Sequence, residues 1–270
     1  CLIHASGSLY SWGVGSCGRL GHDTQEKGGN LRADCGHPTL VKGLASKQCV
    51  RVSCGYSHTL AATATGEVYT WGSAAAGKLG LGSLGSEAES GGAFCPMPVK
   101  VKFPSVLVPN AYGVLKKKAC KIIKVSCGSS HSGAITHERQ LFVWGCGDGG
   151  RLGLSENYEE GGDGVSFHSY DSPQLVQGAL KGKLIGQISC GNTHTLVSTC
   201  VEESFVGGGI NRYKKFSGGE LFVSGPASVL GENYKVFTKI KDFDDEGHII
   251  QHVSAGFLHS AVLTTEGAAF

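Results

Sequence analysis

One phrase recurs three times along the chain, as Leu9-Tyr10-Ser11-Trp12-Gly13, Val68-Tyr69-Thr70-Trp71-Gly72 and Leu141-Phe142-Val143-Trp144-Gly145. Each copy closes a few residues later with glycine, a basic residue and Leu-Gly, as in Gly18-Arg19-Leu20-Gly21. Self-similarity of this kind indicates an architecture built from one repeated supersecondary unit. We therefore expect a single continuous body.

A second phrase alternates with the first and ends in histidine. Its first copy is Val52-Ser53-Cys54-Gly55-Tyr56-Ser57-His58, and later copies end at His131, His194 and His259. His58 and Trp71 are 13 residues apart, as are His131 and Trp144, so the connection inside a unit has a fixed length. The fourth unit is degenerate, because Ser224-Gly225 replaces Trp-Gly while Leu230-Gly231 keeps the closing pair.

The phrases predict short strands. Residues 66–72, 51–55 and 58–63 are apolar, β-branched or small runs bounded by glycine, which is typical of strands of about five residues. A weaker strand begins at Pro38, Pro98 and Pro173, where proline suits an edge strand. Each unit is then a four-stranded antiparallel sheet. Such sheets repeated radially form an all-β fold, the β-propeller, and no amphipathic helix pattern competes.

The alternation of Cys-Gly-x-x-His with Leu-Tyr-x-Trp-Gly and a closing Gly-x-Leu-Gly resembles the regulator of chromosome condensation repeat over nearly the whole chain. The Trp-Asp ending of WD-repeat propellers is absent. The resemblance implies a ring of usually seven blades, whereas about four are visible here. Two interpretations stay open: a fragment of a larger ring, which we favour, and a four-bladed ring whose last sheet is completed by the N-terminal strand. Residues 1–270 form a single propeller domain or propeller fragment in both, with insertions near 84–120, 156–171 and 201–219.

Charge and hydropathy exclude several functions. The chain has 24 basic and 22 acidic residues, and its short lysine runs at 116–118 and 214–215 fall in insertions, so no direct nucleic-acid binding is expected. No apolar run approaches the roughly 20 residues that span a bilayer, so no membrane interaction is expected.

The cysteines indicate the compartment. Cys54, Cys127 and Cys190 share one repeat position with Ala255, which predicts a small buried side chain there. The total of 11 cysteines is odd, and a domain of this size does not need disulfides. We expect reduced thiols in an intracellular protein, cytoplasmic or nuclear.

Candidate catalytic and cofactor motifs do not hold up. The glycines of 13–18 and 145–150 fit the GxGxxG pattern, but Arg-Leu-Gly follows in place of a helix. Cys35 and His37, with His22, have no second closely spaced pair that would complete a zinc site. The acidic insertion at 156–163, with Asp171, lacks the spacing of a calcium loop, and no Gly-x-Ser-x-Gly elbow occurs. No cofactor and no metal are expected. Enzyme activity stays open, with a non-catalytic role favoured.

The recurring aromatic residues and histidines are expected to be structural. The tryptophans should separate blades in the core, and each histidine should tie neighbouring loops through its two ring nitrogens. The family also includes a plant ultraviolet-B photoreceptor, but its Gly-Trp-Arg-His-Thr motif is missing, so light sensing is not expected. These predicted structural residues are Trp12, Trp71, Trp144, His58, His131, His194 and His259.

The two positions between glycine and histidine form the candidate partner site. In the family member that exchanges nucleotide on the GTPase Ran, acidic and histidine residues lie at these positions, facing one mouth of the propeller. The corresponding residues here are Tyr56, Ser57, Ser129, Ser130, Asn192, Thr193, Phe257 and Leu258, none of them Asp, Glu or His.

These residues favour a protein-interaction scaffold, with a mouth anchored by Tyr56 and Phe257 that binds an unidentified protein. Ordinary rim packing of both side chains stays equally open. The alternative function is guanine-nucleotide exchange on a Ran-like small GTPase. The family also occurs as the substrate-recruiting part of large ubiquitin ligases.

Overall fold

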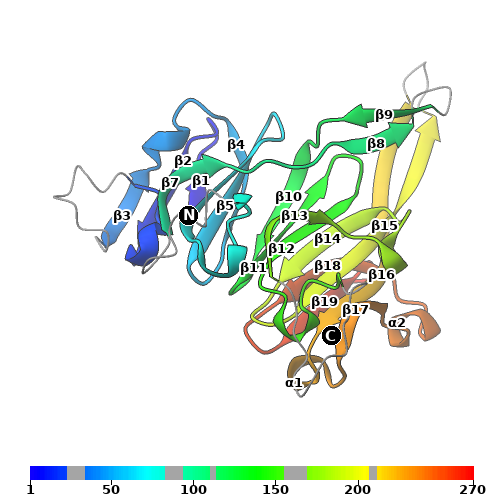
Figure 1. The fold of residues 1–270 in the computed structure, drawn as a ribbon. Coiled ribbons are helices and arrows are strands. Elements are labelled where there is room, and N and C mark those ends of the chain that lie inside the picture. The colour runs from blue at the N-terminus through cyan, green and yellow to red at the C-terminus, as the bar shows by residue number, and fades with distance from the viewer. Residues whose placement is uncertain (23–33, 83–93, 110–113, 155–168, 207–211) are drawn as a thin grey trace.

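The computed structural model describes residues 1–22, 34–82, 94–109, 114–154, 169–206 and 212–270. Figure 1 shows a succession of antiparallel sheets in chain order, from the blue first sheet to the orange and red last strands. The predicted all-β propeller class with four-stranded antiparallel blades is confirmed.

The strands group into sheets that follow the repeat. The first sheet contains β1 (Leu2–Ile3), β2 (Leu9–Gly13) and β3 (Cys35–Leu40). The second contains β4 (Cys49–Cys54), β5 (His58–Thr63), β6 (Val68–Ser73) and β7 (Phe94–Lys100). The third contains β10 (Ile122–Cys127), β11 (His131–Thr136), β12 (Leu141–Gly145) and β13 (Tyr170–Leu175). The fourth contains β14 (Ile185–Cys190), β15 (Thr195–Val206), β16 (Arg212–Gly225) and β17 (Tyr234–Lys239).

A final pair, β18 (Ile250–Ala255) and β19 (Ser260–Thr264), touches the fourth sheet through the single pairing of Gly219 with Ile250. By register, the three strands of the first sheet correspond to β5, β6 and β7, and the final pair corresponds to β4 and β5. The proline strands β3, β7 and β13 lie at sheet edges, as predicted.

The two ends of the sheets differ. We call the end with the turns before His58, His131, His194 and His259 the histidine end. The opposite end, where the chain passes from one sheet to the next, is the connection end. The loops after the Trp-Gly strands also leave from the histidine end, and they contain the short 3-10 turns η1 (Ser16–Gly18), η4 (Ala75–Gly77) and η6 (Asp148–Gly150). Two other such turns, η3 (Lys42–Leu44) and η7 (Gly178–Leu180), follow β3 and β13.

Two of the predicted insertions contain regular structure. The stretch 84–120 includes β7, the fourth strand of its sheet, and a hairpin of β8 (Val106–Pro109) and β9 (Leu115–Lys118). The stretch 201–219 extends β15 and β16 into a long hairpin paired from Cys200 with Gly218 to Val206 with Arg212. The predicted acidic insertion lies largely outside the described residues. Two one-turn helices, α1 (Ala227–Leu230) and α2 (Asp242–Asp245), complete the fold.

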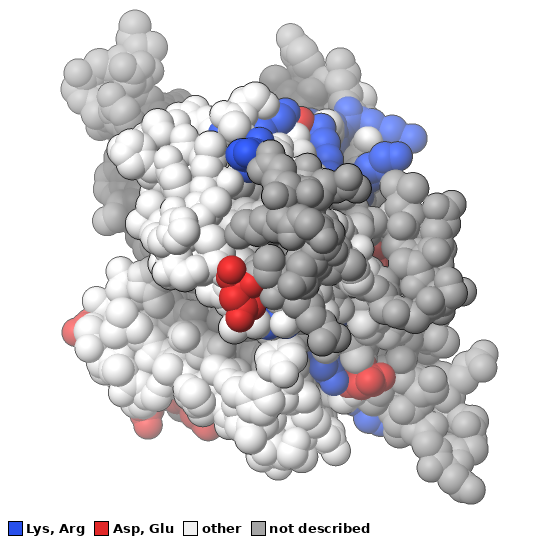
Figure 2. Space-filling view, turned by 90° about the vertical axis from the view of Figure 1, so that its left-hand side faces the viewer, with Lys and Arg blue, Asp and Glu red and all other residues white. Residues whose placement is uncertain are grey.

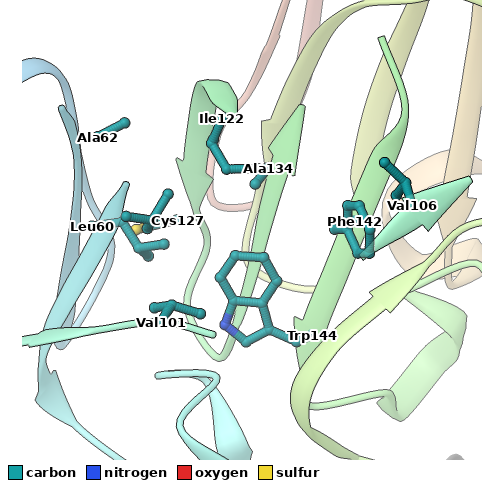
Figure 3. Close-up of a cluster of buried hydrophobic side chains, with 10 residues drawn as sticks. Leu60, Ala62, Val101, Val106, Ile122, Cys127, Ala134, Phe142 and Trp144 are labelled. Atoms are coloured by element: carbon teal, nitrogen blue, oxygen red, sulfur yellow. The ribbon is translucent and has the colours of Figure 1, made fainter. Parts of the chain in front are cut away.

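The core lies between adjacent sheets. At the junction of the second and third sheets, Leu60 and Val101 pack with Phe142 and Trp144, as Figure 3 shows, and all four are buried. Phe103 contacts the rings of Phe142 and Trp144 edge to face, with centroids 5.5 and 5.7 Å apart. Each blade therefore supplies one wall of its neighbour's core.

The tryptophans join one sheet to the loop of the sheet before it. The indole Nε1 of Trp71 donates to the carbonyl of Arg19 at 2.9 Å, and that of Trp144 donates to the carbonyl of Lys78 at 3.0 Å. Both rings are fully buried, whereas Trp12 is 39% exposed because no described loop from a preceding sheet covers it.

The prediction of a buried thiol at the repeated cysteine position is wrong for Cys54. Cys127 and Cys190 are buried, and the Cys127 thiol donates to the carbonyl of Ser53 on the inner strand of the preceding sheet. Cys54 is exposed, because no inner strand precedes β4 among the described residues.

Candidate functional site

The predicted partner residues all lie at the histidine end, in four adjacent turns. These turns, residues 55–57, 128–130, 191–193 and 256–258, are called the turn row. The backbone N–H of Tyr56 donates to the carbonyl of Gly128 at 3.3 Å, and that of Ser129 donates to the carbonyl of Gly191 at 3.1 Å. The first three turns are thus hydrogen-bonded into one rim, and the carbonyl of Gly256 in the fourth turn lies close to Gly191 in the third.

The first glycine of the first three turns is required by this close approach. A Cβ at Gly55 would strike the carbonyl oxygen of Gly128, and a Cβ at Gly128 would strike that of Gly191. Glycine alone lets successive turns approach close enough to share these hydrogen bonds.

A basic side chain from the preceding sheet lies close to a backbone carbonyl of each of the first three turns. Arg19 donates to the carbonyl of Tyr56 at 2.9 Å, and Arg151 donates to that of Asn192 at 3.1 Å. Lys78 occupies the equivalent place, with Nζ 3.2 Å from Ser57 Oγ and 3.5 Å from the Ser129 carbonyl. The backbone of these three turns is therefore preorganised.

The side chains of the turn row differ greatly in exposure. Tyr56 is 71% exposed, Phe257 60% and Leu258 61%, whereas Ser57 is 7% exposed. Four polar residues between them are partly buried: Ser129, Ser130, Asn192 and Thr193. Tyr56 and Phe257 belong to the first and last turns of the row, so apolar side chains flank a polar centre.

The histidines bond across sheet boundaries. Nε2 of His58 lies 2.8 Å from Ser132 Oγ, Nε2 of His131 lies 2.9 Å from Thr195 Oγ1, and Nε2 of His194 lies 3.1 Å from Ser260 Oγ. Both ring nitrogens were expected to take part, but Nδ1 of these three rings is buried with no hydrogen-bond partner in the described part of the chain. His259 is exposed.

Burial keeps these histidines neutral at pH 7. It lowers the pKa of His58 to about 3, and the positive charge of Lys78 acts in the same direction. Burial also holds the pKa of His131 well below its usual value, with a further contribution from the charge of Arg151. A buried neutral imidazole that bonds to a hydroxyl of the next sheet stabilises the fold and is inaccessible to a substrate.

The candidate metal and cofactor motifs of the sequence form no such site among the described residues. Within the described ranges, no three His, Cys, Asp or Glu side chains lie close enough to hold a metal ion. The two GxGxxG stretches run into η1 and η6, each three residues long, and not into a long helix. Cys35 lies in β3, where its thiol donates to the carbonyl of His37 at 3.2 Å.

Sequence reasoning missed the role of the basic residue in Gly-x-Leu-Gly. Arg19, Lys78 and Arg151 each serve the next sheet twice, through the backbone carbonyl and through the side chain. The recurrence of a basic residue at this one position was the available signal.

Sheets of four antiparallel strands, joined across their boundaries by buried tryptophans and histidines, define a class of β-propeller repeat proteins. The family model described as "Regulator of chromosome condensation (RCC1) repeat" matches residues 6–62, 65–135 and 140–198. The chain belongs to the RCC1 repeat family.

Several curated proteins are similar along almost the entire chain. The human E3 ubiquitin-protein ligase HERC2 is 29% identical over 270 residues, which is 99% of this chain and 4% of that protein. The human probable E3 ubiquitin-protein ligase HERC6 is 29% identical over 269 residues, 100% of this chain and 22% of that protein. The ultraviolet-B receptor UVR8 of Arabidopsis thaliana is 27% identical over 259 residues, which is 96% of this chain and 47% of that protein. The chain thus spans less than half the length of each relative.

Solved structures agree in fold. Yeast RCC1 (Prp20), in its complex with Kap60, superimposes with a TM-score of 0.65 at 20% identity, over 94% of this chain and 49% of that chain. Human WBSCR16 superimposes with a TM-score of 0.64 at 21% identity, over 98% of this chain and 56% of that chain. Among the described residues, no helix is both long enough and apolar enough to cross a membrane.

Proposed function

We propose that the chain is a non-catalytic protein-interaction module that binds a protein partner through the turn row. The observation that carries this proposal is the exposure of Tyr56 on the hydrogen-bonded rim and of Phe257 and Leu258 in the turn beside it. Aromatic side chains on a preorganised backbone lose little conformational entropy on binding, so they are suited to anchor an interface.

The chemistry of the rim supports binding over catalysis. Its most exposed side chains are apolar, its centre is polar and uncharged, and the basic groups below it donate to backbone carbonyls. Two relatives are named as ubiquitin ligases, one of them a probable one, and both are far longer than this chain. By analogy, we propose that this propeller serves as a recruiting surface within a larger assembly.

The experiment compares partner sets by quantitative affinity purification. The test variant is Tyr56→Ala/Phe257→Ala/Leu258→Ala at the histidine end. The matched control is Val201→Ala/Val236→Ala, two exposed apolar side chains outside the turn row. The proposal requires that specific partners be lost with the triple variant and retained with the control. Equal recovery with both variants, after both show the wild-type melting temperature, would refute it.

The exchange alternative has its own assay. The structural neighbour Prp20 is described in terms of its binding properties to Gsp1p and histones. Exchange acts on the phosphate and magnesium region of a GTPase, and the eight predicted turn-row residues include no Asp, Glu or His that could disturb it. We expect no acceleration of fluorescent guanine-nucleotide release from Ran. A many-fold acceleration would replace the scaffold proposal with exchange activity.

A further inference from the structure

A polar cavity of about 530 Å³ lies at the connection end, opposite the turn row. It is formed by the inner strands β10, β14 and β18 together with the base of the β15–β16 hairpin. Its lining includes the side chains of Lys124, Arg139, Gln187, Ser198, Thr199 and His252. Its volume is within the range of small-molecule sites, roughly 300–1,000 Å³.

A repeated β-bulge directs one side chain of each inner strand towards this region. The register shifts between Cys49 and Arg51 in β4, and likewise in β10, β14 and β18. The residues that follow the bulges are therefore equivalent, namely Arg51, Lys124, Gln187 and His252. Bulges commonly re-aim a side chain next to a functional site.

Neighbouring bulge residues are connected. Lys124 Nζ donates to the carbonyl of Gly186 at 2.7 Å and to Oε1 of Gln187 at 2.5 Å. An ammonium group has three N–H donors, so one remains for a further acceptor.

The cavity contains positive charge without a lining carboxylate. Lys124 and Arg139 line it, and none of its described lining residues is Asp or Glu. Burial, together with the charges of Arg139 and Arg51, lowers the pKa of Lys124 to about 8. On the face drawn in Figure 2, Lys and Arg gather along the upper edge, the edge where the β8–β9 hairpin lies in Figure 1.

A buried hydroxyl in the cavity wall has no partner. Ser198 is 1% exposed, and its Oγ makes no hydrogen bond in the described part of the chain. Its neighbour Thr199 already accepts from the backbone N–H of Glu220 at 2.8 Å. Buried polar groups are nearly always hydrogen-bonded, so an orphaned hydroxyl that lines a cavity points to an absent acceptor or donor.

We propose that this cavity binds a small molecule through an oxyanion group, phosphate or carboxylate, which Lys124, Arg139 and Ser198 recognise. Lysine and arginine supply charge-assisted hydrogen bonds to such oxygens, and the serine hydroxyl supplies a neutral one. The amide of Gln187 and the ring of His252 would contact the rest of the ligand. The cavity is separate from the turn row, so a negative result for ligand binding here would leave the proposed protein-binding function unaffected.

The test uses isothermal titration calorimetry with inorganic phosphate and, in a second arm, succinate. Saturable binding of phosphate alone assigns a phosphate-bearing ligand, and binding of succinate alone assigns a carboxylate. We expect Lys124→Met to weaken binding at least tenfold and Ser198→Ala to weaken it about threefold. Lys121→Met removes the same charge from an exposed lysine of the connection end outside the cavity, and it should leave the dissociation constant unchanged.

Two results would overturn the proposal. One is the absence of saturable binding of either probe up to 20 mM, on the order of the weakest specific affinities. The other is equal weakening by Lys124→Met and Lys121→Met, which would indicate general electrostatic attraction. If Lys124→Met does not fold, Arg139→Gln replaces it, because Arg139 is the other cation that recognises the oxyanion.

A pH series gives an independent readout. Sulfate serves as the probe because it stays fully ionised. Its affinity should fall as pH rises through about 8, where Lys124 loses its charge. The groups that face Lys124 are Arg51 from β4, Arg139 from the β11–β12 turn, Cys200 from β15 and His252 from β18. A flat profile between pH 7 and 9 would contradict the role assigned to Lys124.

Discussion

The hydroxyl of Ser224 donates to the carbonyl of Arg151 at 3.1 Å, where Trp71 and Trp144 donate an indole N–H to Arg19 and Lys78. The degenerate fourth unit therefore keeps the hydrogen bond of the missing tryptophan. It also keeps an aromatic ring. In the earlier units a Cβ at Gly21 or Gly80 would meet the indole, and in this unit a Cβ at Gly153 would meet the ring of Phe237.

Phe237 stands in the register position of the edge-strand prolines. Pro98 and Pro173 each lie three residues before a valine whose backbone N–H donates to the carbonyl of the first residue of the Trp-Gly phrase. Phe237 likewise lies three residues before Ile240, whose N–H donates to the carbonyl of Leu221 at the same position of the fourth unit. Ser224 thus supplies the hydrogen bond, and Phe237 supplies the aromatic ring, that a single tryptophan supplies in the earlier units. The ring now comes from the outer strand.

A double-mutant cycle tests this exchange. Ser224→Trp alone should destabilise the protein by about 2 kcal/mol, because Phe237 already fills the space and overpacking is unfavourable. Phe237→Pro alone should cost about 3 kcal/mol through the cavity it leaves. The double variant should be more stable than the sum predicts by at least about 1 kcal/mol, measured by urea denaturation. Simple additivity would mean that the two positions are not coupled.

The buried tryptophans should dominate the stability of the junctions. Trp144→Ala removes a fully buried ring that contacts Phe103 and bonds to Lys78, and we expect a loss of about 3–5 kcal/mol in the free energy of unfolding. Trp12→Ala is the matched control at the same repeat position, where 39% exposure predicts less than half that loss in this chain. Equal losses would show that burial between sheets is not the cause.

The neutral histidines should make the fold sensitive to acid. Below pH 6.5 the unfolded chain takes up protons that His58 cannot, since its pKa in the folded state is about 3. Stability therefore falls as pH decreases through this window, with up to about 1.4 kcal/mol per pH unit for each such histidine. His58→Asn should lower stability at pH 7 and flatten the slope between pH 6 and 4 by about that amount. Between pH 7 and 8 the variant and wild-type curves should run parallel. An unchanged slope below pH 6 would contradict the assignment.

A Lys-Glu-Lys triad at the connection end should also make the stability of the fold depend on pH. Glu67 accepts from Lys100 at 2.6 Å and from Lys47 at 2.9 Å, and these hydrogen bonds lower its pKa to about 2. Its stabilisation is present above pH 4.5 and is lost as pH falls towards 2. Because the triad is partly exposed, Glu67→Gln should cost only about 1 kcal/mol at pH 7, and less at pH 3 or in 1 M salt.

The third sheet supplies the control for the triad. Gln140 stands where Glu67 stands, and Leu175 stands where Lys100 stands. Gln140→Glu should therefore not stabilise the protein, because the new carboxylate has no lysine on that strand. A gain in chemical-denaturation midpoint for this variant would show that the flanking lysine is not needed.

The repeated units allowed most of the fold to be predicted, because each strand carries its own local signal. Residues 58–63 were predicted as a strand and form β5, and 51–55 overlap β4. The long hairpin of β15 and β16 was missed, since a stretch with glycine and lysine has no counterpart elsewhere in the chain to compare with.

The candidate sites were less accessible to sequence reasoning. The turn residues could be placed together because they hold one repeat position, but the difference between an exposed Tyr56 and a buried Ser57 depends on neighbouring loops. The Lys124 cavity could not be foreseen, because it combines bulge residues of three strands with Arg139 and Ser198, which follow no common spacing.

The bonds made by Arg19, Lys78 and Arg151 all run from one sheet to the next sheet along the chain. Each of these residues, through its carbonyl and its side chain, completes the sheet that follows it in the chain, so this coupling passes between nearest neighbours. Such an array behaves as a one-dimensional chain of couplings. Breaking one junction should separate the protein into two cooperative blocks that melt independently. The loss of stability should be confined to that junction and should not extend to the other junctions between sheets.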